Sequence, residues 1–377
     1  MMKTVIVGAG VGGIACARRL AAHRGSIEVT VIDRSPEHHF APSFLWLLNG
    51  ARDASQVSRP IGRIEDWGVR YLRAEVTAFD TDARVVATDQ GDVEFDELVL
   101  APGAELAPGE IDGLDQALSF YAKEDALALA SALRSFDGGR ISLVVPSMPY
   151  KCPAAPYEAA FLIERFLRDR KVRAQIGVHT VEPQPLPVAG PKVGGMVAAM
   201  LARRGIDFHA GRVVAGVDTA GQTISFEDGE ERFDMLVAIP THKAPRFVRE
   251  SVLAGPAGWI PVDARTLSAA EHVHAIGDTT AIQLSNGKPL PKAGVFAHAQ
   301  AHVVADNLIA LATGRPGGAT FRGHGSCFLE IGGGKAGVAR GNFYAEPDPA
   351  VRMFPPSRAG HLGKVLFERK WLRQFGS

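Results

Sequence analysis

The chain has 377 residues, which is enough for two or three domains. Apolar residues make up 46% and charged residues 22%, values that are typical of soluble globular proteins and exclude a disordered chain, a collagen or a coiled coil. The 41 Lys and Arg residues balance the 41 Asp and Glu residues, so the net charge argues against a nucleic-acid-binding protein. Three cysteines are too few for a disulfide scaffold but suffice for one redox pair.

The N-terminus does not resemble a targeting signal. The apolar run at residues 4–7 is too short for the core of a signal peptide, and it leads into a glycine motif. We find no apolar stretch of about 18 residues, so no transmembrane helix is predicted. We therefore expect a cytoplasmic protein.

The first predicted elements form a β-α-β unit, which is typical of a parallel α/β sheet. They are a strand at 3–7, a helix at 14–23 and a strand at 27–32 that ends at Asp33. Short strands are predicted next, at 71–79, 84–87 and 97–100, before a turn at 101–104.

A second α/β unit is predicted to start near Leu118. Its elements are a helix at 123–135, a strand at 141–145, a helix at 157–170, a strand at 174–180, a helix at 194–204 and strands up to about residue 239. The chain then returns to the first unit with a strand at 273–276 and a helix at 295–311. Residues 319–377 are expected to form glycine-rich strands and a short helix.

The first strand leads into a G-x-G-x-x-G motif formed by Gly8, Gly10 and Gly13. Gly8 permits a tight turn, Gly10 lets a pyrophosphate approach the backbone, and Gly13 allows close helix–strand packing. Asp33 follows about 20 residues beyond Gly13, where a carboxylate accepts hydrogen bonds from an adenosine ribose. The motif predicts a dinucleotide site; the alternative is a glycine-rich structural turn.

Two later segments indicate which dinucleotide binds there. Gly277 and Asp278 follow the strand at 273–276 and resemble the second flavin motif of the pyridine nucleotide-disulfide oxidoreductase superfamily, in which the Asp binds the ribityl or phosphate end of FAD. The turn containing Ala101 and Gly103 resembles the A-T-G turn of the same superfamily, with Pro102 in place of Thr. The resemblance implies FAD as the cofactor.

The second unit lacks the corresponding nucleotide motif. Its strand at 141–145 runs into residues 146–158, which contain no glycine and four prolines. Because each proline lacks a backbone N–H, a pyrophosphate would find few donors in this turn. We therefore expect that electrons do not arrive from NAD(P)H, and note that Cys152 stands where the nicotinamide half-site would be.

The cysteine segments resemble one group within the superfamily. Residues 151–160, with Cys152, and 323–332, with Cys327, resemble the redox-cysteine segments of sulfide:quinone oxidoreductases and of the flavoprotein subunit of flavocytochrome c sulfide dehydrogenase. Residues 291–297, with Lys292 and Gly294, resemble the lysine segment of these proteins, at the start of the helix facing the flavin. The segment at 40–43, with Pro42, also fits, and the likeness spans roughly residues 3–345.

The resemblance implies a Cys152–Cys327 redox pair, which requires Cα atoms within about 7 Å. Hydrosulfide would attack the disulfide by thiol–disulfide exchange, and electrons would pass through FAD to a membrane quinone. Cys327 is then the cysteine closer to the flavin, Glu158 the proton acceptor, and Lys292 the cation near the flavin. The alternatives are that both cysteines are ordinary buried residues, that Glu158 is a helix-dipole partner, and that Lys292 is a solvated loop residue.

The sequence also departs from these relatives. Tyr121 stands where many sulfide:quinone oxidoreductases carry a third cysteine, which puts long polysulfide products in doubt. No cysteine lies near Pro42, so FAD is expected to bind noncovalently. His38, His39, His298 and His302 show no metal-binding spacing, and Cys16, in a helix, is expected to be a core residue.

The C-terminal segment 361–375 is predicted to be a short basic helix. Phe367, Trp371 and Phe375 recur at every fourth position, and the basic residues are Lys364, Arg369, Lys370 and Arg373. A basic and aromatic helix suits a membrane surface, but the aromatic face could equally dock on the chain's own core or on a second subunit.

These observations predict an α/β protein with two Rossmann-like (three-layer ββα) dinucleotide-binding-type domains and a C-terminal interface or membrane segment. The FAD-binding domain comprises residues 1–110 and 245–318, the second domain residues 111–244, and the C-terminal region residues 319–377.

The predicted function is oxidation of hydrosulfide with a quinone acceptor, by a homo-oligomer peripheral on the inner face of the cell membrane, without a metal and without nucleic acid. The alternatives are an NAD(P)H-dependent flavin oxidoreductase such as a type II NADH dehydrogenase, a sulfide dehydrogenase with a soluble electron carrier, and a flavin-binding sensor or assembly subunit without turnover.

Overall fold

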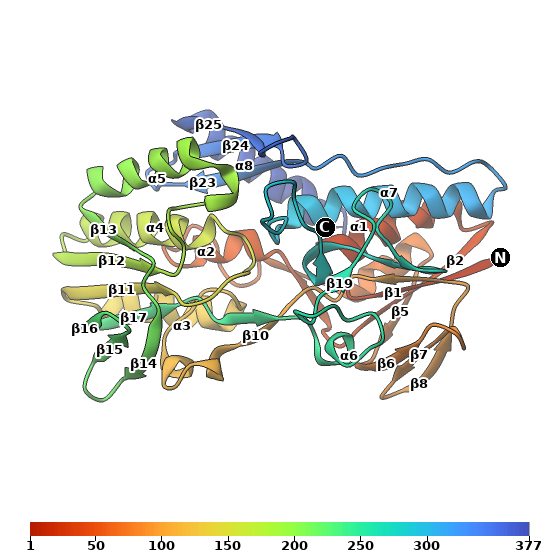
Figure 1. Ribbon diagram of the computed structural model, residues 1–377, viewed down its shortest axis with the longest axis horizontal. Helices are drawn as coiled ribbons and strands as arrows, with labels where there is room; N and C mark the ends of the chain where they lie inside the picture. Colours follow the sequence, from red (N-terminus) through yellow and green to blue (C-terminus); the bar gives the residue numbers. More distant parts are fainter. Residues whose placement is uncertain (377) are drawn as a thin grey trace.

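The computed structural model describes residues 1–376 and contains two α/β bodies side by side, with a third layer across them (Figure 1). The first body has a six-stranded sheet in the order β20-β21-β9-β1-β2-β5, in which only β20 is antiparallel to its neighbour. Its strands are β1 (Met2–Val7), β2 (Ile27–Asp33), β5 (Arg70–Arg73), β9 (Glu97–Leu100), β20 (Ser268–Ala270) and β21 (Val273–Ala275).

Helices cover one face of this sheet, and a small sheet covers the other. α1 (Val11–Leu20) and α7 (Gly294–Ala312) pack on the first face. On the opposite face, Val5 and Val7 of β1 pack with Val86 of a three-stranded antiparallel sheet. That sheet consists of β6 (Val76–Asp80), β7 (Val85–Thr88) and β8 (Gly91–Glu94). The three layers are those predicted for a Rossmann-like fold.

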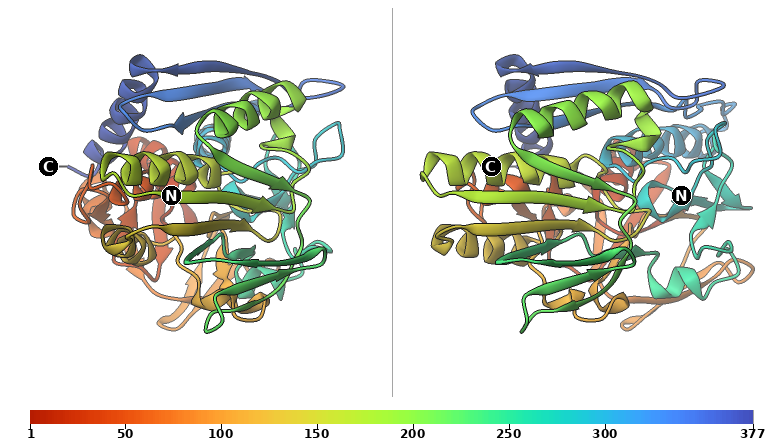
Figure 2. Two further views of the ribbon diagram at one scale, coloured as in Figure 1. Left: turned by 90° about the vertical axis from the view of Figure 1, so that its left-hand side faces the viewer. Right: turned by 60° about the vertical axis from the view of Figure 1, so that its left-hand side comes forward.

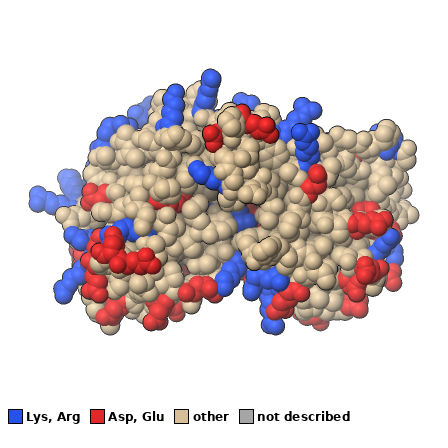
Figure 3. Space-filling view, in the orientation of Figure 1, with Lys and Arg blue, Asp and Glu red and all other residues tan. Residues whose placement is uncertain are grey.

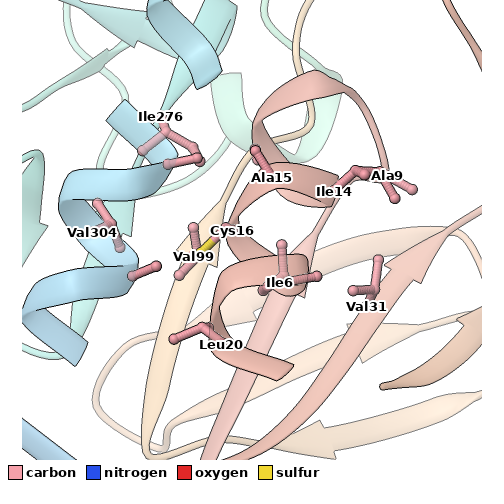
Figure 4. Packing of buried hydrophobic residues seen from close by; sticks show 14 of the residues in the cluster. Ile6, Ala9, Ile14, Ala15, Cys16, Leu20, Val31, Val99, Ile276 and Val304 are labelled. Atoms are coloured by element: carbon pink, nitrogen blue, oxygen red, sulfur yellow. The ribbon is translucent and has the colours of Figure 1, made fainter. Parts of the chain in front are cut away.

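Cys16 lies in the core of the first body. Figure 4 shows it on α1, facing Val99 of β9 and the α7 side of the core. Its side chain is fully buried, and this burial raises the pKa of its thiol to about 12. The interpretation of Cys16 as a packing residue is confirmed.

The second body repeats the same layering. Its parallel sheet has the order β13-β12-β11-β17, formed by β11 (Gly139–Val145), β12 (Ala174–Thr180), β13 (Ile206–Ala210) and β17 (Met235–Ala238). One face packs on α3 (Lys123–Ser135), α4 (Ala155–Asp169) and α5 (Pro191–Arg203). The other face packs on the antiparallel strands β14 (Val214–Asp218), β15 (Thr223–Phe226) and β16 (Gly229–Arg232). Because both faces of β11 are covered, its sequence is a nearly continuous apolar run.

One predicted strand is wrong. The segment 71–79 forms two strands, β5 and β6, which belong to different sheets. The break falls at Ala74, whose N–H donates to the carbonyl of Asp33 at the end of β2. The chain thus leaves the parallel sheet where β2 ends, so the continuous alternation of apolar and polar residues through 71–79 does not produce one strand.

Short elements connect the two bodies. β10 and β18 form an antiparallel pair between them. Outside the sheets and helices described so far and the C-terminal layer, the remaining short elements are β3 (Glu37–His39), α2 (Phe44–Leu47), β4 (Ser58–Pro60), β10 (Glu105–Ala107), β18 (Thr241–Lys243), α6 (Arg246–Arg249), β19 (Ile260–Pro261) and β22 (Thr280–Ala281).

The C-terminal part forms a layer over both bodies. An antiparallel sheet of β23 (His324–Glu330), β24 (Ala336–Asn342) and β25 (Ala350–Ser357) is followed by α8 (Arg358–Arg373). Figure 2 shows this layer above α4 and α5. β23 contacts both α4 of the second body and α7 of the first. The layer therefore closes the seam between the two bodies.

The aromatic face of α8 packs on the chain's own core. Trp371 and Phe375 are buried, the Trp371 indole N–H donates to His38 Nε2 at 2.8 Å, and Phe375 stacks on the His38 ring with centroids 5.0 Å apart. Arg52 and Glu368 add a buried ion pair at 2.6 Å. These aromatic side chains cannot enter a lipid headgroup layer, which corrects that part of the membrane-helix prediction. Phe367 is partly buried against the same core.

Within residues 1–376, no helix combines the length and apolarity needed to cross a bilayer. On the face drawn in Figure 3, acidic and basic side chains are intermixed. This distribution agrees with the zero net charge of the sequence.

We predict that Trp371→Ala destabilises the protein. The substitution removes a buried aromatic side chain and leaves His38 Nε2 without its donor, so the free energy of unfolding should fall by about 3–5 kcal/mol. Urea unfolding followed by far-ultraviolet circular dichroism measures this change. Leu366→Ala is the matched control on the same helix. Because Leu366 is 55% exposed, this substitution should lower the free energy of unfolding only slightly. Equal effects of both substitutions would contradict the docking of α8 seen here.

Candidate functional site

The glycine turn after β1 has the geometry of a phosphate cradle. Gly8 has φ +98°, and a Cβ there would lie 2.3 Å from the carbonyl oxygen of Ala101. A Cβ at Gly13 would lie 1.8 Å from the carbonyl oxygen of Gly8. At Gly10, by contrast, a Cβ would meet nothing within 4 Å, and Gly10 caps α1 without any side-chain hydrogen bond. The turn is therefore tightly packed inside and open at Gly10, where the helix N–H groups face outward.

Asp33 lies beside this turn, at the end of β2. Its carboxylate accepts hydrogen bonds from the N–H of Ala9 at 2.6 Å and of Ser35 at 2.8 Å. Asp33 also lines a cavity of about 640 Å³, together with Gly8 and Ala104. Asp33 thus stabilises the glycine turn through its hydrogen bonds. The cavity that it lines has a volume typical of small-molecule binding pockets.

Asp278 supplies an independent test of whether FAD fits. It lies in the turn after β21, and its Oδ1 atom is buried without a hydrogen-bond partner among the described residues. Burial raises the pKa of this carboxyl, and Lys151 and Lys292 oppose that rise. A buried carboxylate oxygen without a donor is costly. A ribityl hydroxyl of FAD is a donor that would satisfy this oxygen, so these residues fit FAD.

Lys292 is buried rather than solvated. Its Nζ donates to the carbonyls of Asp278 at 2.5 Å and Thr280 at 3.3 Å, and it lies 3.4 Å from the centroid of the Trp259 ring. Burial lowers the pKa of Lys292 to about 8. The alternative of a solvated loop lysine is wrong.

The other predicted cofactor residues lie close to the cradle or to α8. Ala101 contacts Gly8, Gly103 follows with φ +74°, and Gly294 starts α7 facing Val11 at the start of α1. Pro42 lies in a short 3-10 turn that is hydrogen-bonded to α8 through Ser43 and Glu368.

His38 is a positioning residue that the sequence analysis missed. Its Nδ1 lies 2.8 Å from the carbonyl oxygen of Ala9 in the glycine turn, while its Nε2 accepts from Trp371. Burial lowers the pKa of His38 to about 4, so the ring is neutral and can donate at one nitrogen and accept at the other. It joins the glycine turn to the C-terminal helix.

The structure brings Cys152 and Cys327 together as free thiols that share a hydrogen bond. Cys152 lies in the turn between β11 and α4, and Cys327 lies in β23. The Cys152 N–H donates to the carbonyl of Lys292 at 2.7 Å, which joins this turn to the lysine segment of the first body. Both cysteines are half-buried. A disulfide between them stays a prediction.

The shared hydrogen bond makes the two thiols unequal. It raises the pKa of Cys152 well above its usual value, and burial acts in the same direction. The same hydrogen bond lowers the pKa of Cys327. Of the two thiols, Cys327 is thus the one whose pKa is lowered.

Glu158 faces the cysteine pair from the first turn of α4. It is 2% exposed and forms an ion pair with Lys364 of α8. Burial raises the pKa of Glu158 to about 7, and Lys364 opposes this rise. Its charge in turn raises the pKa of both cysteines. Glu158 is more than a helix-dipole partner.

Tyrosines fill the place of a second nucleotide. Glu182 lies just after β12 of the second body, a position comparable to that of Asp33 at the end of β2 in the first body. The Glu182 side chain is completely buried. Its Oε2 accepts hydrogen bonds from the hydroxyls of Tyr150, at 3.0 Å, and Tyr157. Tyr157 is itself fully buried on α4. A ribose could not reach Glu182 without displacing these rings, which supports the sequence argument from the four prolines.

An apolar cavity of about 80 Å³ adjoins Cys327. It lies between the second body, the start of α7 and the C-terminal sheet. Its lining includes Met148, Val188, Phe296, Phe328, Phe343 and Met353. Such a lining suits uncharged ligands.

One polar cluster was not expected from the sequence. His179 and His209 are paired on β12 and β13, and their ligand atoms and those of Glu231 lie within 4.8 Å of one another. The two rings are stacked 4.6 Å apart at 3°, so their lone pairs run parallel and cannot both meet one ion. Arg212 also donates to Glu231 at 2.7 Å. The cluster is explained as a cross-strand stack with an ion pair.

Residues 2–301 match the family described as pyridine nucleotide-disulphide oxidoreductase. Because this match covers most of the chain, the protein belongs to that family of oxidoreductases. Membership implies a flavin cofactor of the FAD type, in agreement with the fit of the glycine turn and Asp278.

Relatives within the family narrow the comparison. The chain is 25% identical to the sulfide-quinone reductase of Aquifex aeolicus, and the match covers 98% of this chain and 90% of that protein. It is 24% identical to the mitochondrial sulfide:quinone oxidoreductase of Mus musculus, and the match covers 92% of this chain and 79% of that protein. A type II NADH:quinone oxidoreductase of Mycobacterium tuberculosis is 26% identical over 61% of this chain and 54% of that protein. The crystal structure of the Aquifex aeolicus sulfide:quinone oxidoreductase has a TM-score of 0.89 at 23% identity, covering 100% of this chain and 91% of that one, which confirms the fold.

We predict that Gly10→Ala weakens FAD binding without unfolding the chain. A methyl group at Gly10 meets no protein atom within 4 Å but occupies the open side of the cradle, so the dissociation constant should rise roughly tenfold. The bound FAD per chain is measured by absorbance, and folding by circular dichroism. Gly62→Ala is the control, because it also meets nothing within 4 Å but lies outside the cradle. Unchanged FAD affinity in Gly10→Ala would place the pyrophosphate elsewhere.

Proposed function

We propose that this protein oxidises sulfide through the Cys152–Cys327 pair and delivers the electrons by way of noncovalently bound FAD to a quinone. The main observation in support is the position of the two cysteines. They meet at the seam between the bodies, and Cys152 is hydrogen-bonded to the lysine segment that starts α7. The similarity to two sulfide:quinone oxidoreductases supports sulfide as the substrate and quinone as the electron acceptor.

The residues suggest the following chemistry. Hydrosulfide attacks the Cys152 sulfur of the oxidised pair, so that a new S–S bond forms on Cys152, the old S–S bond breaks, and Cys327 leaves as a thiolate. Glu158 takes the proton of the hydrosulfide at its carboxylate. A second hydrosulfide or thiol then takes the outer sulfur from Cys152, so that Cys152 is left as a thiolate. When bound, FAD would accept the two electrons released as the Cys152–Cys327 bond re-forms, and would pass them to quinone. The lowered pKa of Cys327 suits it as the leaving thiolate.

A second candidate is oxidation of NAD(P)H, because a type II NADH:quinone oxidoreductase is also a relative. It is disfavoured by the second body, where Tyr150 and Tyr157 hold Glu182 and prolines replace the glycine turn. A soluble electron carrier in place of quinone stays open as an alternative acceptor.

We predict that sulfide, and not NADH, bleaches the flavin of the anaerobic FAD-loaded protein. Cys152→Ser and Cys327→Ser should each abolish bleaching by sulfide, because either serine prevents disulfide exchange. Cys16→Ala is the matched control, since this cysteine is buried in the core and should leave the reaction intact. Visible absorbance follows the reaction. Bleaching by NADH alone would reject the proposal.

The outer face of α8 is the part of the molecule that we propose contacts a membrane. Leu362 and Leu366 are 56% and 55% exposed, and Phe354 of β25 is 57% exposed. Four exposed basic residues lie on the same helix: Arg358, Arg369, Lys370 and Arg373. Exposed apolar side chains next to cations suit an anionic lipid surface. This surface would let the protein reach quinone from the inner face of the cell membrane.

We predict that the protein co-sediments with vesicles containing phosphatidylglycerol and that salt weakens this binding. Leu366→Glu should reduce the bound fraction several-fold, because it places a charge on the lipid-facing side. Leu311→Glu is the control, since Leu311 is 58% exposed but lies on α7. Equal binding of both variants would move the contact surface away from α8.

We further propose the division into an FAD-binding domain of residues 1–110 and 245–318, a second domain of residues 111–244 and a C-terminal region of residues 319–377. A homo-oligomer is part of the same proposal. Each copy of the chain would then hold one cysteine pair and one glycine cradle.

A further inference from the structure

A buried series of ionisable groups runs from the cysteine pair toward the surface. Glu158 is ion-paired with Lys364, and the backbone N–H of Glu330 also faces the Glu158 carboxyl. Glu330, at the end of β23, is 1% exposed, and its carboxylate lies 2.6 Å from Nδ1 of His361. The His361 side chain is 34% exposed. The series therefore begins beside the two thiols and ends at water.

The charges in this series do not balance without a proton. Glu158 and Glu330 are two buried carboxylates, and Lys364, which is paired with Glu158, is the buried cation of this series among the described residues. Arg52, which like Lys364 lies over the Trp46 ring, is paired with Glu368 instead. Because an uncompensated buried charge is expensive, two buried carboxylates beside one buried cation favour the uptake of a proton by the series.

Few ionisable groups face Glu158 from the elements around it. The turn before α4 contributes Cys152, and β23 contributes Cys327 and Glu330. α8 contributes Lys364 to Glu158 and His361 to Glu330, and α2 contributes the neutral ring of Trp46. The proton thus has these few groups to occupy.

We propose that Glu158, Glu330 and His361 carry the protons released by sulfide oxidation from the cysteine pair to water, and that Lys364 is the positioning residue that holds Glu158 ready to accept them. This inference rests on the proposed function. It assigns to α8 a part in the reaction, since two of the four residues come from that helix.

The proton balance is simple. When hydrosulfide adds to Cys152, its S–H bond breaks and the proton bonds to the Glu158 carboxylate, while the electron pair of the broken Cys152–Cys327 bond stays on Cys327 as a thiolate. The proton then passes to the Glu330 carboxylate and on to His361, which releases it to water. Glu158 returns to its ionised state for the next turnover.

The other side of the cysteine pair offers no comparable exit. The cavity beside Cys327 is lined by apolar side chains, and its carboxyl group, Glu182, is completely buried. Hydroxyls of Tyr150, Tyr157 and Thr180 already donate to that carboxylate. A proton placed there would have no exposed group to reach.

The test uses the full-length FAD-loaded protein and anaerobic stopped-flow reduction by sulfide. Glu330→Gln and His361→Ala should each slow flavin bleaching by roughly tenfold or more, and free imidazole should restore the rate of His361→Ala in proportion to its concentration. Reduction by dithionite should be unchanged, because it needs no proton exit from the cysteine pair. A lost packing contact would not respond to imidazole.

The Glu97–His272 pair is a matched control on the first body. His272 Nδ1 lies 2.8 Å from Glu97 Oε1, and the two side chains are 31% and 5% exposed, respectively. Glu97 lies on β9, and His272 directly precedes β21, so the pair belongs to the sheet of the first body. Glu97→Gln and His272→Ala should leave the sulfide rate unchanged. Equal rates for wild type, Glu330→Gln and His361→Ala would overturn the proton path while leaving the proposed function intact. A wild-type protein that sulfide never bleaches would reject both.

A second measurement does not depend on turnover. Infrared difference spectra against pH report the protonated carboxyl of Glu158, identified by its loss in Glu158→Gln. The wild-type midpoint should lie near 7, and Lys364→Met should raise it because the opposing cation is gone, with Lys364→Arg restoring it. An unmoved midpoint in Lys364→Met would remove Lys364 from the positioning role.

Discussion

The hydrogen bond from the Cys152 N–H to the Lys292 carbonyl is the contact on which the site depends. It links the turn after β11 of the second body to the segment that starts α7 of the first. Cys152 adopts φ +53°, a conformation that side-chain-bearing residues rarely take, and the Tyr121 hydroxyl holds the preceding carbonyl at 2.8 Å. The surrounding structure thus fixes the backbone conformation of Cys152. This conformation directs Cys152 toward the seam between the two bodies, where β23 carries Cys327.

The features that could be predicted from the sequence are local. The spacing of Gly8, Gly10 and Gly13 specifies a turn whose packing needs are met within one β-α-β unit. The lack of glycine after β11 is equally local, and it argues against a second cradle. Cys152 and Cys327 were paired only through resemblance, because their meeting depends on how the C-terminal sheet crosses two bodies.

What the sequence did not reveal are contacts between distant segments. Glu158 and Lys364 lie in different layers, and no periodicity in either helix signals that a buried lysine will face a buried glutamate. His38 carries no motif, yet it binds both the glycine turn and Trp371. The segment 71–79 misled for a related reason, since its apolar pattern does not record where the neighbouring strand β2 ends.

The two bodies have the same three layers but different turns at the ends of β1 and β11. At the end of β1, small residues leave the N-terminus of α1 open, so that a phosphate can approach the backbone. At the end of β11, prolines remove donors, and Tyr150 and Tyr157 occupy the space around Glu182. In the second body, side chains thus occupy the place of a nucleotide, and the turn after β11 presents Cys152. The Cys152 sulfur is half-buried, and the proposed donor, hydrosulfide, is small enough to reach it.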